Sequence, residues 1–309
     1  MMRRRWLGAV ALAATLAMAA AACGTTTPTG GGTPSGGGTS PTSPAGAFGA
    51  VRDPAIAAEV PAAIRSKGSV TVASDATYPP VEFVTPGTTT VVGMDPDLGH
   101  AIGAVLGIQF NFVNVTFDKI LLGLKGGQYD IGMSAFTDTK ARENTVDFVD
   151  YFQAGTSFVV PAGSSLNLTS LSQICGLTVS VEGGTTEQSD ATTQSKACTK
   201  EGKKAVNVLV FPTQTGANLA LSTGRAQVMM ADTPVAAYQV KLSNGKFKLE
   251  GAYGVAPYGI AVPKGSGMAQ PILDALKKLI AEGIYTKILA KWGTSSGAIT
   301  TPAINGAIG

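Results

Sequence analysis

Residues 130–142 read D-I-G-M-S-A-F-T-D-T-K-A-R, and this stretch decides the fold. Its apolar start predicts a buried strand that runs into a polar loop, so Ser134 and Thr137 follow the end of a parallel strand. Open α/β sheets bind ligands at that carboxyl edge. Arg142 follows on the first helical turn, where its planar guanidinium, beside two hydroxyls, suits a small carboxylate. A surface arginine behind a capped helix start is the alternative for this stretch taken alone.

Segments typical of strands alternate with segments typical of helices on both sides of this stretch. Asp95 is expected to cap one helix, with Pro96 at its first position. Alternation of this kind predicts βαβ units and a mainly parallel sheet. The expected strands lie at residues 70–73, 110–115, 128–133, 177–181, 206–211, 227–231 and 258–262, and the expected helices at 60–66, 95–106, 119–124, 215–223 and 268–292, the last broken at Gly283.

The composition indicates a globular protein of two lobes. The chain has 309 residues, of which 44% are hydrophobic and 14% are charged. Its formal charge of +3 comes from three arginines at positions 3–5, and without them 20 of the 23 cations face 20 acids. No basic patch is left to favour nucleic acid. With one histidine and three cysteines, the sequence also offers no metal cluster.

The N-terminus has the pattern of a secretory signal peptide over residues 1–22, with a basic start and an apolar centre. Residues 20–23 resemble a bacterial lipobox, although Ala20 replaces the usual leucine, so Cys23 is predicted to carry lipid at the outer face of the cytoplasmic membrane. A retained membrane anchor is the alternative. Residues 24–49, rich in Gly, Thr, Ser and Pro, predict a flexible tether with an end-to-end distance of about 25 to 30 Å.

Two cysteines remain if Cys23 is lipidated, namely Cys175 and Cys198. In an oxidising compartment this is the number that one disulfide needs. The chain-entropy model gives such a bond about 3 kcal/mol of stabilisation. Two buried free thiols are the alternative.

Seven short motifs, in this order, are similar to those of bacterial extracellular solute-binding proteins of the amino-acid class, family 3. Members of this family capture the substrate for ABC importers. The likeness extends from about residue 60 to residue 292. The motifs are residues 75–80 (DATYPP), 92–98 (VGMDPDL), 134–142, 184–186 (GTT), 231–232 (AD), 257–262 (PYGIAV) and 283–285 (GIY).

The resemblance implies a two-lobe α/β fold of the periplasmic-binding-protein type (type II). Lobe 1 would take residues 60–155 and 258–292, lobe 2 residues 157–256, and residues 293–309 would be a flexible tail. The chain would cross the hinge twice, and the lobes would close around a ligand in the cleft. It also implies a monomer that passes a free amino acid to an ABC transporter permease and needs no cofactor.

The family pattern also assigns roles to the two ends of an amino acid. Arg142 resembles the arginine that grips the α-carboxylate, helped by Thr137 and by the turn at Thr185 and Thr186. Asp232 matches the carboxylate that takes the α-ammonium, with further contacts from Ser134 or Ala135. Arg142 and Asp232 support these roles independently of the resemblance, because a zwitterion leaves water only if both of its charges are matched.

The side-chain end of the cleft is expected to hold Asp75, Glu182 and two aromatic rings, Tyr78 and Phe117, that sandwich the ligand. Two departures from the family pattern weaken the contacts: Ala135 replaces a frequent serine, and a valine replaces a frequent phenylalanine after the prolines. Aromatic faces attract cations, and acids penalise ligands of like charge. If Glu182 faces the ligand and not solvent, arginine, lysine, histidine or glutamine is favoured over aspartate or glutamate.

Three other functions are alternatives to capture for import. A cyclohexadienyl-type dehydratase on the same fold would use Glu182 as general acid. A sensory module would present the ligand to a receptor. A hydrolase nucleophile at residues 293–297 lacks the strand-to-helix context, and the sole histidine precedes it. The sequence therefore predicts a binding protein and not an enzyme.

Overall fold

The computed structural model describes residues 47–308. The predicted signal peptide at residues 1–22, the lipidated Cys23 and nearly all of the tether lie outside this range. Among the described residues, none of the helices is long and apolar enough to cross a membrane.

One continuous sheet of eight strands runs through residues 47–308 in the order β5-β1-β6-β11-β7-β10-β8-β9. In lobe 1, β1 (Ser69–Ser74) pairs in parallel with β5 (Gln109–Asn114) and with β6 (Ile131–Gly132). In lobe 2, parallel pairing joins β8 to both of its neighbours, which confirms the expected βαβ units in each half. The lobe 2 strands are β8 (Thr178–Glu182), β9 (Asn207–Phe211) and β10 (Val228–Asp232).

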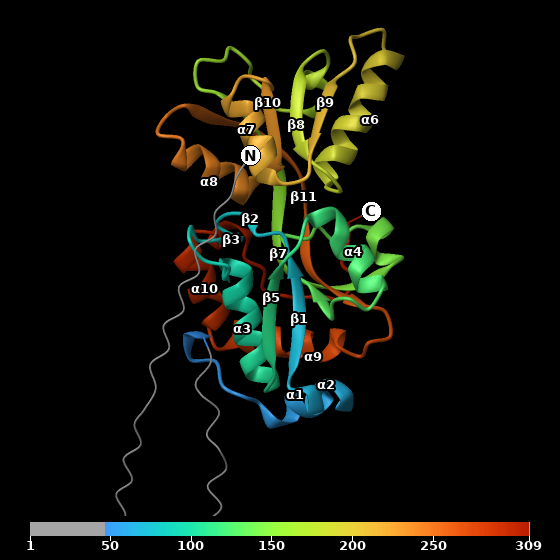
Figure 1. The fold of residues 1–309 in the computed structure, drawn as a ribbon, viewed down its shortest axis with the longest axis vertical. Coiled ribbons are helices and arrows are strands. Elements are labelled where there is room, and N and C mark those ends of the chain that lie inside the picture. Colours follow the sequence, from blue (N-terminus) through green and yellow to red (C-terminus); the bar gives the residue numbers. More distant parts are fainter. Residues whose placement is uncertain (1–46, 309) are drawn as a thin grey trace, which may run out of the picture. The chain divides into compact units, whose positions relative to one another are not determined.

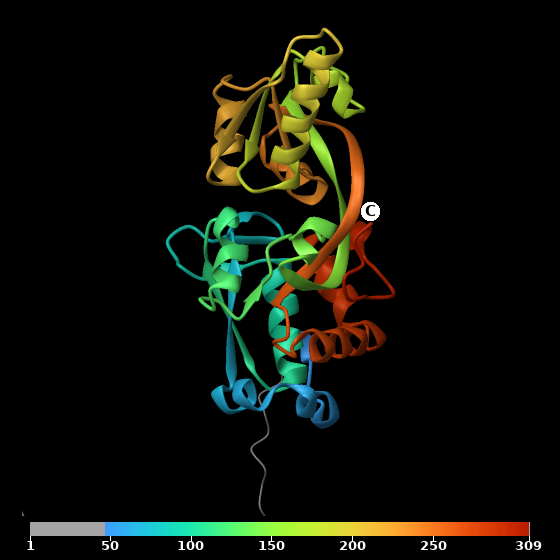
Figure 2. The same cartoon turned by 90° about the vertical axis from the view of Figure 1, so that its right-hand side faces the viewer.

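Two long strands form the hinge. They are β7 (Val146–Pro161) and β11 (Phe247–Pro263), and they pair antiparallel over most of their length. Figure 2 shows both strands passing from one lobe into the other. The predicted lobe boundaries near residues 155 and 257 fall inside these strands, so the chain crosses twice without a loop. Register shifts interrupt the pairing between Leu249 and Ala252 and between Tyr253 and Ala256.

Helices cover both halves of the sheet (Figure 1). Lobe 1 also carries a small sheet of three short strands, β2 (Thr77–Tyr78), β3 (Glu82–Val84) and β4 (Val91–Val92). Its helices are η1 (Ala47–Gly49), α1 (Pro54–Glu59), α2 (Ala62–Lys67), α3 (Met94–Leu106), α4 (Phe117–Lys125), α5 (Lys140–Glu143), α9 (Ala269–Ala281), α10 (Ile284–Trp292) and η3 (Ser295–Gly297). Those of lobe 2 are η2 (Leu171–Ile174), α6 (Thr186–Lys200), α7 (Gln214–Ser222) and α8 (Thr233–Leu242).

The N-cap of helix α3 lies two residues earlier than the sequence predicts. Gly93 is its N-cap, and the backbone there has φ 142° and lies so close to Val81 that a Cβ would collide with the Val81 carbonyl oxygen. Asp95 therefore lies inside the first turn and is fully buried. Its carboxylate accepts hydrogen bonds from the Tyr151 hydroxyl at 2.8 Å and the Ala135 N–H at 3.2 Å, so the predicted cap is corrected to a buried anchor.

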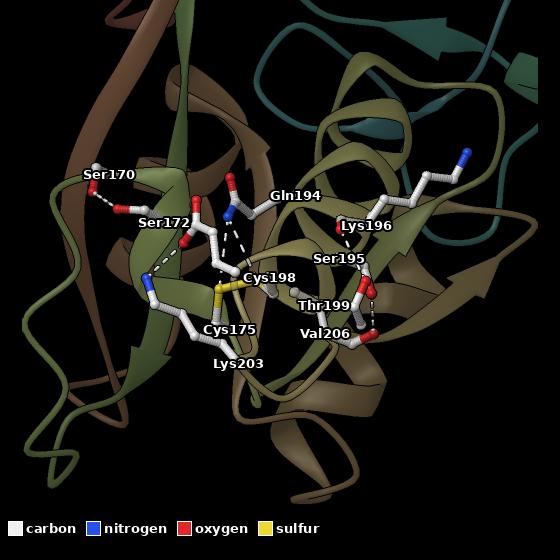
Figure 3. Close-up of a disulfide and its surroundings, with 11 residues drawn as sticks. Ser170, Ser172, Cys175, Gln194, Ser195, Lys196, Cys198, Thr199, Lys203 and Val206 are labelled. Atoms are coloured by element: carbon white, nitrogen blue, oxygen red, sulfur yellow. Dashed lines mark hydrogen bonds and ion pairs between the residues drawn. A yellow bond between two sulfur atoms is a disulfide. The ribbon is translucent and has the colours of Figure 1, made fainter.

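The predicted disulfide is present in the structure. Cys175, directly after η2, is bonded to Cys198 on α6, with 5.7 Å between the Cα atoms. Figure 3 shows the bond with the Gln194 side chain beside both sulfur atoms. Cys198 is fully buried in the second hydrophobic core, which lies within lobe 2. The bond thus fastens the outer helix of lobe 2 to the segment that enters its first strand.

The segment after Gly293 differs from the flexible tail that the sequence predicts. Thr294 is buried, and η3 follows it. Ile304 then forms an antiparallel bridge with Val149 of β7. Residues 294–308 are therefore packed on lobe 1, although their composition of Gly, Ser, Thr and Ala is typical of a tail.

Candidate functional site

The two lobes share a cavity, and each lobe supplies part of its wall. It lies at the carboxyl ends of the strands, as the sequence predicts for an open α/β sheet. Eight predicted residues line it: Tyr78, Phe117, Ala135, Thr137 and Arg142 from lobe 1, and Thr185, Thr186 and Asp232 from lobe 2. Three further predicted residues, Asp75, Ser134 and Glu182, lie behind its wall.

Arg142 stands on the short helix α5, whose N-cap is Thr139. Its guanidinium donates to the Thr137 carbonyl oxygen at 2.8 Å and to the Gly184 carbonyl oxygen of lobe 2 at 3.0 Å. It also lies over the Phe136 ring, 4.6 Å from the centroid. Burial lowers the pKa of Arg142, and the acids opposite counteract this. Its charge is therefore held in place before any ligand arrives.

Two acids of lobe 2 face this arginine across the cavity. Asp232 ends β10, and Glu187 lies in the first turn of α6 with 4% of its surface exposed. Glu187 accepts from the Thr156 hydroxyl of the hinge at 2.8 Å. Burial, followed by the nearby Glu187, raises the pKa of Asp232 well above its usual range. Of the described residues that line the cavity, Arg142 is the single cation, so the lining can match one anionic and one cationic group.

The aromatic wall consists of Tyr78 and Phe117. Their ring centroids are 6.1 Å apart, with an angle of 62° between the planes. The Tyr78 hydroxyl is buried and lacks a hydrogen-bond partner among residues 47–308. Beside this wall, the Gln214 N–H of lobe 2 donates to the Thr77 hydroxyl of lobe 1 at 3.2 Å. Together with the Arg142 to Gly184 bond, this contact means that the lobes touch on both sides of the cavity.

Asp75 and Ser134 support the wall from behind. Asp75 is 1% exposed, and its carboxylate accepts from the Phe117 N–H at 2.9 Å and the Thr77 hydroxyl at 2.7 Å. The Ser134 hydroxyl accepts from the Asp75 N–H at 2.8 Å and donates to Glu82 at 3.0 Å. The single donor position of that hydroxyl and one of its acceptor positions are thus used within the protein.

Glu182 ends β8 and is 1% exposed, so it does not point to solvent. Neither of its carboxyl oxygens has a hydrogen-bond partner among the described residues. Burial raises the pKa of Glu182 to about 10, and the neighbouring Asp75 adds to this, while Tyr78 lowers it. A buried, unpartnered carboxyl is costly, and native proteins place such groups where a donor or a ligand satisfies them.

The loop after β6 holds Ala135 in a strained conformation at the cavity. Its φ of 44° is in the left-handed region, which a residue with a Cβ rarely adopts. The buried Asp95 holds its N–H, as described above. Strain of this kind gathers at ligand sites and persists because the surrounding structure enforces it.

Four lining residues were missed by the sequence analysis. Glu187 follows the GTT turn directly, and the polar run of α6 gave no sign that this one side chain is buried. Gln214 opens α7, and its burial depends on contact with the other lobe. The four are Glu187, Gln214, Ala231 and Val235.

The family model for bacterial extracellular solute-binding proteins, family 3, matches residues 70–295. The chain belongs to this family. The match spans both lobes and ends within η3, so most of the tail after α10 lies beyond it.

Two curated relatives and one solved structure are similar to this solute-binding protein. The arginine-binding protein ArgT of Corynebacterium glutamicum is 34% identical over 254 residues, which are 82% of this chain and 83% of ArgT. The ABC transporter glutamine-binding protein GlnH of Bacillus subtilis is 31% identical over 217 residues, 67% of this chain and 74% of GlnH. An ancestral arginine-binding protein bound to arginine has a TM-score of 0.67 and 34% identity, covering 73% of this chain and 98% of that chain.

Proposed function

We propose that this solute-binding protein captures arginine outside the cytoplasm and delivers it to an ABC transporter permease. The observation that carries the choice of ligand is Glu182, a buried carboxyl without a partner, beside Asp75 and the unpartnered Tyr78 hydroxyl. Behind the cavity wall at this end, the Glu182 carboxyl suits a ligand rich in donors, and a guanidinium has five N–H groups. The names of the relatives above support the same ligand and favour a binding protein over a dehydratase.

The ligand would lie with its two charged main-chain groups between the lobes. Its α-carboxylate would meet Arg142 and the Thr137 hydroxyl. Its α-ammonium would meet Asp232 and Glu187. The guanidinium would then lie against the wall of Tyr78 and Phe117 and point toward Glu182, since aromatic faces attract cations and burial of a charge demands a partner.

Capture would be coupled to closure of the lobes. The groups proposed for the α-carboxylate belong to lobe 1, and those for the α-ammonium belong to lobe 2. A ligand that bridges both stabilises only the closed arrangement and shifts the population toward it. The closed arrangement is the form that a permease would distinguish from the open one.

Glutamine is the second candidate. Its amide supplies two donors and can also fill the end of the cavity near Glu182. Glutamine would leave the neighbouring acids without a matching charge, so we expect its affinity to be lower than that of arginine and higher than that of glutamate. Lysine and histidine also have cationic side chains, so they belong to the same class of ligand as arginine.

We also propose that the protein acts as a monomer anchored by lipid at Cys23. The lipobox-like residues 20–23 and the Gly-rich tether support this, because a tethered lobe pair can reach a membrane permease. Mass spectrometry of the membrane fraction should find a diacylated peptide that begins at Cys23. Cys23→Ala should release the protein or leave an uncleaved precursor, whereas an unmodified N-terminus at another residue would refute the anchor.

The experiment that tests the function is a thermal-shift screen of the purified domain against the twenty amino acids. Arginine should give the largest rise in Tm, because a ligand that binds only the folded state stabilises it by mass action. The same screen on Arg142→Ala should lose that rise. A largest shift with glutamate or aspartate would contradict the proposal.

A further inference from the structure

The last described residues form an isolated antiparallel bridge with the lobe 1 part of β7. Ile304 bridges Val149 of β7, and the Asp150 N–H donates to the Ala303 carbonyl oxygen at 2.8 Å. The Asn305 N–H in turn donates to the Phe148 carbonyl oxygen at 3.0 Å. This segment lies beyond the residues that match the family model. Its contacts therefore lie outside the part of the chain that the family model describes.

Side chains and backbone N–H groups fasten the segment at further points. The Asn305 side chain accepts from the Phe148 N–H at 2.8 Å. The Gly306 N–H donates to Asp150 at 3.0 Å, and the Ala307 N–H donates to Glu143 at 3.3 Å. A Cβ on Gly306 would collide with the Asp150 carboxylate, so an alanine there requires the strap or the Asp150 side chain to shift. We call residues 303–307 the C-terminal strap.

The strap contacts the helix that carries Arg142. Glu143 is the neighbour of Arg142 on α5, a helix of four residues without a buried residue. Isolated helices this short are unstable in water. One cap holds the N-terminal end, where the Thr139 hydroxyl accepts from the Arg142 N–H at 3.2 Å. The bond from Ala307 holds the other end of the helix.

We propose that the C-terminal strap positions Arg142 for the ligand by fixing α5 against β7, with Glu143 and Asp150 as positioning residues. Neither residue lines the cavity. They act through the placement of the guanidinium, whose two bonds to Thr137 and Gly184 span the lobes. The inference rests on the proposed function in one respect: arginine is the ligand with which the effect of the strap on affinity is measured.

Acidic and basic side chains surround the strap. Asp138 is buried beside Asp150, and burial, with acids nearby, raises the pKa values of the two to about 6 and about 7. Glu143 adds negative charge, and it is paired with Lys140 at 3.0 Å. On the other side, Lys264 pairs with Asp147 at 3.1 Å. Two acids with raised pKa values in the folded protein stabilise it at low pH, and this contribution is lost as the pH rises through about 7.

Three variants on α5 test the proposal. Glu143→Ala removes the acceptor for Ala307, Glu143→Gln keeps an acceptor, and Lys140→Ala removes only the ion pair. Glu143→Ala should weaken arginine binding about fivefold in calorimetry and speed hydrogen exchange at the Arg142 N–H. Glu143→Gln and Lys140→Ala should stay within about twofold of the wild type in both measurements. Failure of Glu143→Gln to restore binding and protection would overturn the proposal.

A second pair of variants leaves the charges unchanged. Gly306→Ala should displace the strap and speed exchange at the Arg142 N–H, whereas Gly163→Ala adds the same methyl group to open space and should change nothing. Exchange is measured on the ligand-free protein, so it tests the strap even if arginine is the wrong ligand. Unchanged exchange in both Gly306→Ala and Glu143→Ala refutes the strap. Absence of arginine binding in the wild type refutes the proposed ligand instead.

Discussion

The two ends of the cavity differ in how their polar groups are satisfied. At the end built around Arg142, the guanidinium already bonds to Thr137 and Gly184, and Glu187 accepts from Thr156. At the end built around Glu182, neither carboxyl oxygen has a partner among the described residues, and neither does the Tyr78 hydroxyl. The guanidinium at the first end is held by the protein, while the carboxyl at the second end is left to satisfy.

Because of this difference, one end can recognise amino acids in general, and the other can distinguish one amino acid from another. Every amino acid carries an α-carboxylate and an α-ammonium, so a preorganised end serves all of them at low cost in ordering. The unsatisfied end is costly in the absence of a donor, and a ligand that supplies one recovers that cost. Discrimination between amino acids should therefore depend on the second end.

The largest effect should come from the preorganised end. Arg142→Ala or Asp232→Ala leaves one ligand charge buried without its partner, which costs about 2 to 5 kcal/mol, or roughly 30-fold or more in affinity. Calorimetry with arginine measures this. Arg225→Ala, an exposed arginine over Phe211 in lobe 2, is the matched control and should bind normally. Binding within threefold of the wild type in either cavity variant would remove these residues from the site.

The next effect should be selective. Glu182→Gln keeps the shape of the side chain and removes its ability to ionise, so arginine should bind about tenfold more weakly, as expected for a bond to a charged group. Glutamine, which brings no charge, should change by less than about threefold. Glu201→Gln, an exposed acid paired with Lys203, is the control. Equal losses for both ligands would mean that Glu182 supports the fold and does not choose the ligand.

A smaller effect concerns protons. Glu182, with a pKa of about 10, is neutral at pH 8, and a guanidinium beside it favours the carboxylate. Arginine binding should therefore release about one proton at pH 8, and the affinity should rise with pH up to about 10. Calorimetry in two buffers of different ionisation enthalpy measures the release. Glu182→Gln should abolish it, and proton uptake in the wild type would contradict this sign.

The raised pKa of Glu182 also affects stability in the absence of ligand. Because the folded protein holds this proton up to about pH 10 and the unfolded chain releases it near pH 4.5, the contribution is present at low pH and lost as the pH rises. Glu182→Gln should flatten the dependence of the free energy of unfolding on pH. A wild-type protein that gains stability between pH 6 and pH 9 would argue against a protonated Glu182.

The smallest effect on binding should come from the disulfide. Cys175 and Cys198 are 23 residues apart in sequence and lie away from both ends of the cavity. Replacing both with alanine should lower the free energy of unfolding by about 3 kcal/mol in the chain-entropy model and leave the arginine affinity unchanged. Denaturant unfolding and calorimetry together check this. A loss of affinity without a loss of stability would link lobe 2 to the site by another route.

The sequence predicted that Arg142, Thr137 and Asp232 would lie together, and they line one cavity. Arg142, Thr137 and Asp232 each follow a strand, and the carboxyl ends of strands face the cleft in this fold, so their meeting follows from topology. The buried side of the site was harder to predict. Asp95 looks like an N-cap, yet Gly93 takes that position and turns Asp95 inward. Ser134 looks free to bind, yet Glu82 and Asp75 use its hydroxyl.

The tail shows where composition misleads. Gly, Ser, Thr and Ala side chains offer little apolar surface to bury, so a segment rich in them is predicted to be mobile. Here small residues are what allows close approach, since Gly306 lies against the Asp150 carboxylate and Asn305 adopts a φ of 56°. Such contacts depend on strands that are distant in sequence, and no local pattern announces them.

The most direct test of the central claim is competition calorimetry at low salt with arginine, glutamine and glutamate. If the acids around Glu182 choose the ligand, arginine binds most tightly, glutamine follows, and glutamate is weaker than arginine by at least about tenfold. Glutamate that binds at least tenfold more tightly than both arginine and glutamine would contradict the account.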